Sequence, residues 1–370
     1  MAIKRKISKS ELVEFINSYK IKELSKFEKD VLYTLEHIHY VDVLDKIKIR
    51  QDKLKLHQPS QFLTFYKPSE QHQILPSCVA CLDNKITHIR HSDQCNCNCD
   101  FCYFKGSPEG HRFIPKWAYR ESMTRFNIDL EEIKLLLEKQ LFGKVKAIGW
   151  LEKEPLMDMD KMIPLMEFIN LKQLEGWNHS YQYLYTNGIL ATEDNLKRLK
   201  DAGLSEIRFN LQATDFSDAV LSNMVKACEI IDNVCIETPI YSKSFKNMIK
   251  YKELIKNSGI KQINMPELQL GPSTFNLFND EGMIYRHRRG YVSPVSSRHY
   301  VYDLIELAIK ESWPLVINDC SNDAKFYRGV SLVESRDIRC GIAYRTEFSF
   351  LPSNYYLYVV NKYVQSVLDI

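Results

Sequence analysis

The stretch Cys95-Asn-Cys-Asn-Cys99-Asp-Phe-Cys102 decides how this chain folds and works, because it spaces three cysteines as C-x3-C-x2-C. Thiolates are the usual ligands of iron–sulfur clusters, and a cluster that only transfers electrons is held by four of them. Three thiolates can hold a [4Fe-4S] cluster with one iron left open to a further ligand. The spacing therefore indicates a cluster on Cys95, Cys99 and Cys102, with chemistry at the open iron.

The neighbouring cysteines leave two other arrangements open. Six of the ten cysteines lie between Cys78 and Cys102. No apolar stretch follows the basic N-terminus, so we expect no signal peptide and a cytoplasmic protein, in which metal ligation is a commoner use of cysteines than disulfides. One alternative is a four-cysteine electron-transfer cluster that includes Cys97. The other is a zinc ribbon with two C-x2-C pairs as ligands, Cys78 with Cys81 and Cys99 with Cys102.

The overall composition is that of an ordinary globular protein. The 370 residues are 45% hydrophobic and 26% charged, which is enough to bury a sizeable core. The net charge of +3 is too small to indicate binding to nucleic acid or to a membrane surface. No apolar run approaches the roughly 18–20 residues that a membrane span needs.

From about residue 84, short β-rich runs recur, most of them separated by helical stretches. The intervening helices include Asp129–Leu141 and Asp194–Ala202, and Gly203 is a typical stop for the second. This alternation over six units predicts an α/β fold with a parallel sheet, either open or rolled into a barrel. The six runs are Ile86–Arg90, Val145–Ile148, Tyr181–Tyr185, Glu206–Leu211, Val234–Glu237 and Gln262–Met265.

The two ends of the chain have different patterns. Residues 8–57 show helical spacing of apolar side chains, so we predict an N-terminal helical extension over residues 1–77. A core domain follows over residues 78–270. Residues 271–370 are expected to complete or cap it, with a helix at about 298–312, a seventh β-like run at Leu315–Asn318 and a β-hairpin within 343–360.

Four motifs in the same order resemble the radical S-adenosylmethionine (AdoMet) superfamily. The first is the cysteine triad with Phe101 before its last cysteine, since the superfamily has an aromatic residue there. The other three are Gly149-Trp-Leu-Glu-Lys-Glu154-Pro155, Tyr185-Thr-Asn-Gly188 and the passage Leu199–Asn210. The resemblance covers roughly residues 78–270. It implies a partial (β/α)6 barrel with AdoMet across the carboxyl ends of the strands, as in other parallel barrels.

The resemblance also implies an activity. An enzyme of this kind passes one electron to AdoMet and forms methionine and a 5′-deoxyadenosyl radical, which abstracts hydrogen from a substrate. The implied partners are an electron donor such as flavodoxin or ferredoxin and a polar small-molecule or peptide substrate. The competing hypothesis is a non-catalytic iron–sulfur or zinc protein that transfers electrons or binds a partner.

Carried over position by position, the resemblance names residues around AdoMet. Gly-Gly-Glu-Pro of the superfamily is replaced here by Glu-Lys-Glu-Pro, so the side chains of residues 152 and 153 must point away or the loop must shift. The implied AdoMet contacts come from the aromatic, acidic and amide residues after successive strands. They are Phe101, Tyr103, Glu152, Lys153, Glu154, Thr186, Asn187, Asn210, Gln212 and Glu237.

A second metal site is a further hypothesis. Cys78 and Cys81 form a C-x2-C pair, and Cys320 and Cys340 could supply two more ligands for zinc or a second iron–sulfur cluster. The Cys78 pair and the segment around Cys320 are weakly similar to the group of pyruvate formate-lyase activating enzymes. Reduced, unpaired thiols are the alternative.

The cluster assignment predicts the outcome of cysteine replacement. Anaerobically prepared protein should be brown and carry about four irons, because thiolate-ligated clusters absorb visible light. Replacing Cys95, Cys99 or Cys102 by Ala should abolish the colour and the bound iron, and Cys97→Ala should keep both. Iron and sulfide analysis checks this, and an essential Cys97 beside a dispensable member of the triad would refute the assignment.

Overall fold

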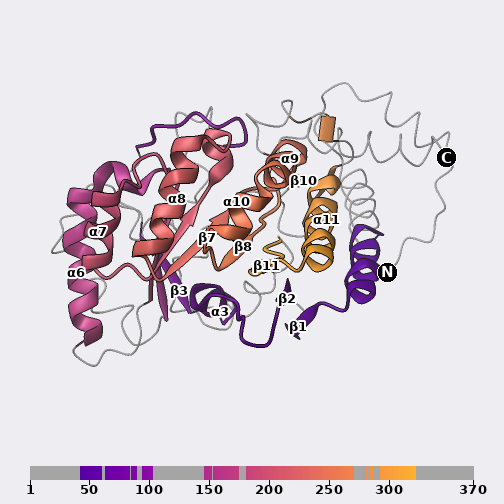
Figure 1. Ribbon diagram of the computed structural model, residues 1–370, viewed down its shortest axis with the longest axis horizontal. Coiled ribbons are helices and arrows are strands. Elements are labelled where there is room, and N and C mark those ends of the chain that lie inside the picture. Colours follow the sequence, from indigo (N-terminus) through magenta and orange to yellow (C-terminus); the bar gives the residue numbers. More distant parts are fainter. Residues whose placement is uncertain are drawn as a thin grey trace, which may run out of the picture.

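The computed structural model describes residues 42–60, 63–83, 85–89, 94–102, 146–151, 153–174, 181–270, 278, 280–281, 284–286 and 292–321. Within these residues the strands form a nine-stranded sheet in the order β1-β2-β11-β8-β7-β6-β5-β4-β3 and a separate two-stranded ribbon (Figure 1). The strands of the large sheet are β1 (His57–Ser60), β2 (Leu63–Tyr66), β3 (Ile86–Ile89), β4 (Ala147–Trp150), β5 (Tyr181–Thr186), β6 (Glu206–Phe209), β7 (Asn233–Glu237), β8 (Gln262–Asn264) and β11 (Val316–Asn318). The ribbon pairs β9 (Ile284–Arg286) with β10 (Val292–Pro294).

Seven strands of this sheet, from β3 through β8 to β11, are parallel neighbours. All six β-rich runs found in the sequence form strands, and the seventh run forms β11, which pairs with β8. Among the described residues, β1 and β3 each have a single neighbour, so the sheet is open. The α/β fold with a parallel sheet is therefore confirmed, and an open sheet is consistent with the partial barrel.

Among the described residues, seven complete helices flank or connect the strands. They are α3 (Pro76–Leu82), α6 (Met159–Leu174), α7 (Glu193–Asp201), α8 (Asp218–Ile230), α9 (Ser242–Lys250), α10 (Lys252–Asn257) and α11 (Val295–Glu311). Thr192 caps the start of α7 by accepting a hydrogen bond from the backbone N–H of Asn195, and Gly203, with φ +95°, follows its end. The predicted helix Asp129–Leu141 and hairpin at 343–360 lie outside the described residues.

The two faces of the sheet carry different side chains, because successive residues of a strand point to opposite sides. The outer face carries apolar residues such as Leu184, Ile207 and Ile263, which are buried with the apolar sides of α6 to α11 in the main core. The inner face carries polar residues, of which Arg208 is one. Helix α3 lies on this inner face, with Ala80 packed against Ala147 and Tyr183, and Figure 1 shows it apart from the row of the other helices.

The N-terminal extension differs from the expectation of helices alone. Residues 42–54 are helical, but residues 57–66 contain β1 and β2, and β2 pairs antiparallel with β11. Phe65 is buried against Ile74 and Val316, and the Tyr66 hydroxyl donates a 3.0 Å hydrogen bond to the carbonyl of Trp313. This apolar packing against the last parallel strand, which has a free edge without β2, explains why the segment extends the sheet. Within the described residues, no helix has both the length and the apolar character needed to cross a bilayer.

Gly149 of β4 lies at a tightly filled position of the inner face. A Cβ atom added there would lie 2.6 Å from both His88 Cδ2 and Tyr183 Cζ. These two side chains are themselves held together by a 2.9 Å hydrogen bond between His88 Nε2 and the Tyr183 hydroxyl. The glycine is therefore a packing requirement of the sheet.

Gly149→Ala should lower the free energy of unfolding by about 1–3 kcal/mol, the usual cost of overpacking a filled core. Urea or thermal unfolding followed by circular dichroism measures this. Leu171→Ala, on the exposed side of α6, is the control and should change stability by no more than about 0.5 kcal/mol. Equal stabilities of the Gly149→Ala variant and the natural protein would contradict the packing described.

Candidate active site

The carboxyl ends of β3 to β7 lie on one rim of the sheet because these strands are parallel. The cysteine loop follows β3, Glu154 follows β4, Asn187 follows β5 and Asn210 follows β6, whereas Glu237 ends β7. Residues that are far apart in the sequence are thereby brought to the same side of the molecule. This geometry is the one that the sequence analysis assumed when it assigned AdoMet to the carboxyl ends of the strands.

The cysteine loop is fastened to this rim by three hydrogen bonds. The backbone N–H of Glu154 donates to the carbonyl of Gln94 at 3.0 Å, and Asn187 Nδ2 donates to Asn96 Oδ1 at 2.6 Å. The Cys99 thiol donates to the carbonyl of Ala213 at 3.7 Å. The segments after β4, β5 and β6 therefore hold the loop that the sequence assigns to the cluster.

Phe101 anchors the end of the same loop. Its ring is buried in an apolar cluster with Tyr241, Leu268, Leu270 and Phe278, and its centroid lies 6.2 Å from that of Tyr241. The contact of Phe101 with AdoMet stays a prediction, and the structure adds a packing role that the sequence did not indicate. Tyr103 lies outside the described residues.

The thiols of the loop lie close to one another, with Cys95 exposed and the other three cysteines half-buried. Burial is the main reason why the pKa of Cys99 is raised to about 12, and the nearby Cys97, Cys102 and Cys95 raise it further. Protonated thiols on one short loop are a donor set that a cation can convert to thiolates, with release of protons. Across the described ranges, no three Cys, His, Asp or Glu side chains are gathered as a preformed metal site. The fit to a cluster therefore rests on the donor chemistry and the spacing of the three cysteines.

Glu154 joins the ends of β4 and β5. Its Oε1 accepts hydrogen bonds from the Thr186 hydroxyl at 2.8 Å and from the backbone N–H of Leu156 at 3.2 Å, and its Oε2 accepts one from the backbone N–H of Asn187 at 2.7 Å. The side chain is completely buried. This carboxylate is therefore held by three protein donors, and its predicted contact with AdoMet stays a prediction.

Lys153 shows how the loop accommodates the missing glycine. Its φ is +45°, in the left-handed region that glycine adopts at little cost, and its side chain is exposed. The side chain is therefore in solvent, and the backbone conformation typical of glycine is kept. The Lys153 ammonium also lowers the pKa of Cys95 slightly against the larger raising effect of burial. Glu152 lies outside the described residues.

Of the remaining residues predicted to contact AdoMet, some are hydrogen-bonded within the protein and one has a donor left for a ligand. The Thr186 hydroxyl accepts from the backbone N–H of Gly188 at 3.0 Å, so it shapes the turn after β5. Gln212 is buried and bonded to Asp215 and Asn247. Asn210 accepts a 3.3 Å bond from Thr238 through Oδ1, and no described acceptor lies within reach of its Nδ2. Asn210 is therefore the amide best placed to donate to a ligand at the rim.

The proposed second metal site is not supported by the described residues. Cys78 Sγ instead accepts hydrogen bonds from Gln262 Nε2 at 3.2 Å and Arg208 NH2 at 3.4 Å on the inner face. Burial raises the pKa of Cys78 to about 12, and the nearby Cys81 and Cys320 thiols add to the rise. Cys81 and Cys320 are half-buried, and Cys340 lies outside the described residues. The zinc ribbon gains no support either, because no described cysteines form a metal-binding group.

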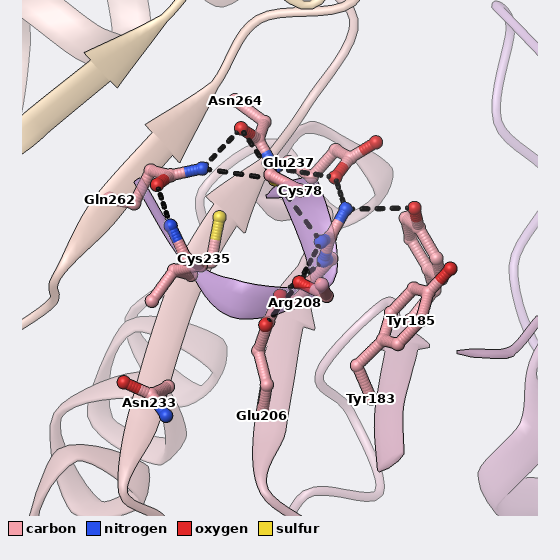
Figure 2. Close-up of polar contacts among 12 residues, drawn as sticks. Cys78, Tyr183, Tyr185, Glu206, Arg208, Asn233, Cys235, Glu237, Gln262 and Asn264 are labelled. Carbon is pink, nitrogen blue, oxygen red and sulfur yellow. Dashed lines mark hydrogen bonds and ion pairs between the residues drawn. The ribbon is translucent and has the colours of Figure 1, made fainter. Parts of the chain in front are cut away.

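The inner face below the rim carries a buried polar network that sequence reasoning found only in part (Figure 2). We call it the inner-face network. Its centre is Arg208, bonded to Glu206 and Glu237 at 2.5 Å each and stacked over the rings of Tyr183 and Tyr185. The other members are Ser77, Cys78, Gln262, Asn264 and Asn318. Of these residues, the sequence motifs singled out Cys78 and Glu237, whereas the packing of α3 against the sheet left no signal in the sequence.

Burial raises the pKa of Glu154 from 4.5 to about 7, although its three hydrogen bonds act in the opposite direction. The folded state thus binds this proton more tightly than the unfolded state, so the resulting stabilisation is full at low pH and is lost as the pH rises toward 7. Relative to a Glu154→Gln variant, the natural protein should lose about 3 kcal/mol of unfolding free energy between pH 4.5 and 7. Urea unfolding of both proteins across this range measures the difference. Glu167→Gln, at an exposed glutamate of α6, is the control, and a pH-independent difference would contradict the burial effect.

Comparison with known proteins identifies the domain that carries this rim. Residues 89–266 match the model of the radical SAM superfamily, in which SAM is AdoMet. A Methanocaldococcus jannaschii protein provisionally named as a glycyl-radical enzyme activating enzyme is 24% identical over 197 residues, which are 51% of this chain and 49% of that protein. The chain thus spans about half the length of this relative.

Two solved structures are also similar. Streptococcus suis SuiB bound to its precursor peptide SuiA matches with a TM-score of 0.44 and 11% identity over 63% of this chain and 48% of SuiB. The native anSMEcpe structure with bound AdoMet matches with a TM-score of 0.42 and 14% identity over 63% of each chain. The motif order, the parallel sheet and the family match agree: residues 89–266 of this chain belong to the radical SAM superfamily.

Proposed function

We propose that this protein is a radical AdoMet enzyme with a [4Fe-4S] cluster on Cys95, Cys99 and Cys102. The observation that carries the proposal is the attachment of the cysteine loop to the strand ends through Glu154, Asn187 and Ala213. When bound and reduced, the cluster supplies one electron that cleaves AdoMet to methionine and a 5′-deoxyadenosyl radical, which abstracts hydrogen from the substrate.

The residues of the chain have separate tasks in this proposal. Glu154 and Thr186 hold the ends of β4 and β5 at a fixed separation, which keeps the loop in position. Asn210 donates its free amide N–H to the ribose or carboxylate of AdoMet. The inner-face network closes the floor beneath the rim, so that the radical is formed away from bulk water.

The proposed partners follow from the activity. The reaction needs a one-electron donor such as flavodoxin or ferredoxin, and we expect the enzyme to meet it in the cytoplasm. The substrate is a polar small molecule or a peptide. The family match gives no support to the competing hypothesis of a non-catalytic iron–sulfur or zinc protein.

The test is anaerobic incubation of reduced, cluster-loaded protein with AdoMet, followed by measurement of 5′-deoxyadenosine and methionine. The natural protein should form both in equal amounts. Asn210→Ala should lower the rate at least about 10-fold, corresponding to the loss of about 1.4 kcal/mol of binding in the transition state. Asn257→Ala, at the exposed end of α10, is the matched control and should be unchanged. A protein with a full, reducible cluster that forms no 5′-deoxyadenosine would overturn the proposal.

A further inference from the structure

The inner-face network has an excess of negative charge. Arg208 is 4% exposed and lies between two carboxylates, those of Glu206, which is fully buried, and Glu237, which is 11% exposed. One guanidinium against two carboxylates leaves a net charge of −1. Because Glu237 is the more exposed partner, the excess charge faces the carboxyl rim of the sheet.

The amide side chains of the network have fixed orientations. Gln262 Oε1 accepts from the backbone N–H of Leu75 at 2.8 Å, so its Nε2 donates to Asn264 Oδ1 at 2.6 Å. Asn264 Nδ2 in turn donates to Glu237 Oε2 at 2.9 Å. The chain of hydrogen bonds begins at a backbone N–H, which can only donate, and ends at a carboxylate, which can only accept. Both constraints give the same orientation for the two side-chain amides.

Asn318 completes the row with an unused acceptor. Its Nδ2 donates to Asn264 Oδ1 at 2.8 Å. The residue is only 4% exposed, and its Oδ1 is buried with no hydrogen-bond partner among the described residues. A buried carbonyl without a partner costs about 1–3 kcal/mol, so this atom is suited to a donor that the protein itself does not supply.

Glu237 has the second unused acceptor. Arg208 and Asn264 both donate to Oε2, and within the described part of the chain no donor reaches Oε1. Figure 2 shows one carboxylate oxygen of Glu237 pointing away from the other labelled side chains. Glu237, Asn264 and Asn318 are register partners on β7, β8 and β11, so both unused acceptors lie at the same level, at the strand ends.

We propose that this row is a substrate subsite that binds a protonated amine, with the ammonium on Glu237 and a second N–H group of the same molecule on Asn318. Two unused acceptors with a net charge of −1 select a donor that is also a cation. With one strand between them, the two residues are about 10 Å apart at their α-carbons, which suits two N–H groups better than one. The inference rests on the proposed function, because it takes the molecule bound at this rim to be the substrate.

The test measures binding and does not require turnover. Cluster-loaded protein with saturating AdoMet is titrated with n-butylamine, and binding is followed by saturation-transfer NMR. The matched neutral probe is n-butanol. The amine should bind at least 10-fold more tightly than the alcohol. Glu237→Gln should remove this preference, Asn318→Ala should weaken binding of a lysine-containing tripeptide, and Glu306→Gln on α11 should change nothing. Circular dichroism confirms that each variant is folded.

The outcomes separate this inference from the proposed function. Equal binding of amine and alcohol, or an unchanged preference in folded Glu237→Gln protein, would overturn the subsite. Displacement of AdoMet by the amine would also overturn it, because Glu237 would then belong to the AdoMet site. Comparison of free lysine with the tripeptide distinguishes a small-molecule from a peptide source of the amine. Selective amine binding by protein with a full, reducible cluster that does not cleave AdoMet would leave an amine-binding site on Glu237 and Asn318 but refute the proposed enzyme activity, and with it the role of this site for a substrate.

Discussion

The burial of Arg208 on the inner face is the constraint on which the rest of the structure depends. An isolated buried charge is very costly, and removing one partner from a buried ion pair typically costs about 3–5 kcal/mol. Arg208 is compensated by Glu206 from its own strand, by Glu237 from β7 and by the Ser77 hydroxyl from α3. These contacts fix α3 against the sheet and fix the sides of β6 and β7 that face inward. An inner face built in this way is polar, unlike the apolar interior of a purely structural barrel.

The rim above this network is held by the buried side chain of Glu154. This side chain joins the ends of β4 and β5, and the backbone N–H of the same residue donates a hydrogen bond to Gln94 at the start of the cysteine loop. The loop proposed to hold the cluster is therefore attached to strand ends and not only to its own flanking residues. Fixed placement of reactive groups is what an enzyme with a radical intermediate needs, because a misplaced radical attacks protein or solvent.

Much of this could be predicted from the sequence, because the signals were local. The alternation of β-rich runs and helices predicted the parallel sheet, and the cluster assigned from the C-x3-C-x2-C spacing stays a prediction. The hairpin of β1 and β2 was missed because its stability comes from pairing with β11, more than 200 residues away. The engagement of the Glu154 carboxylate and the part of Cys78 in the inner-face network were missed for the same reason. Both depend on partners that only the folded chain brings together.

The measurement that most directly tests the central claim is electron paramagnetic resonance of the reduced cluster with and without AdoMet. Three thiolates leave one iron open, so AdoMet bound there should alter the spectrum of the reduced cluster. The account predicts a clear change on addition of AdoMet that is weakened in Asn210→Ala protein. An identical spectrum in the presence of saturating AdoMet, from a fully reduced cluster, would contradict it.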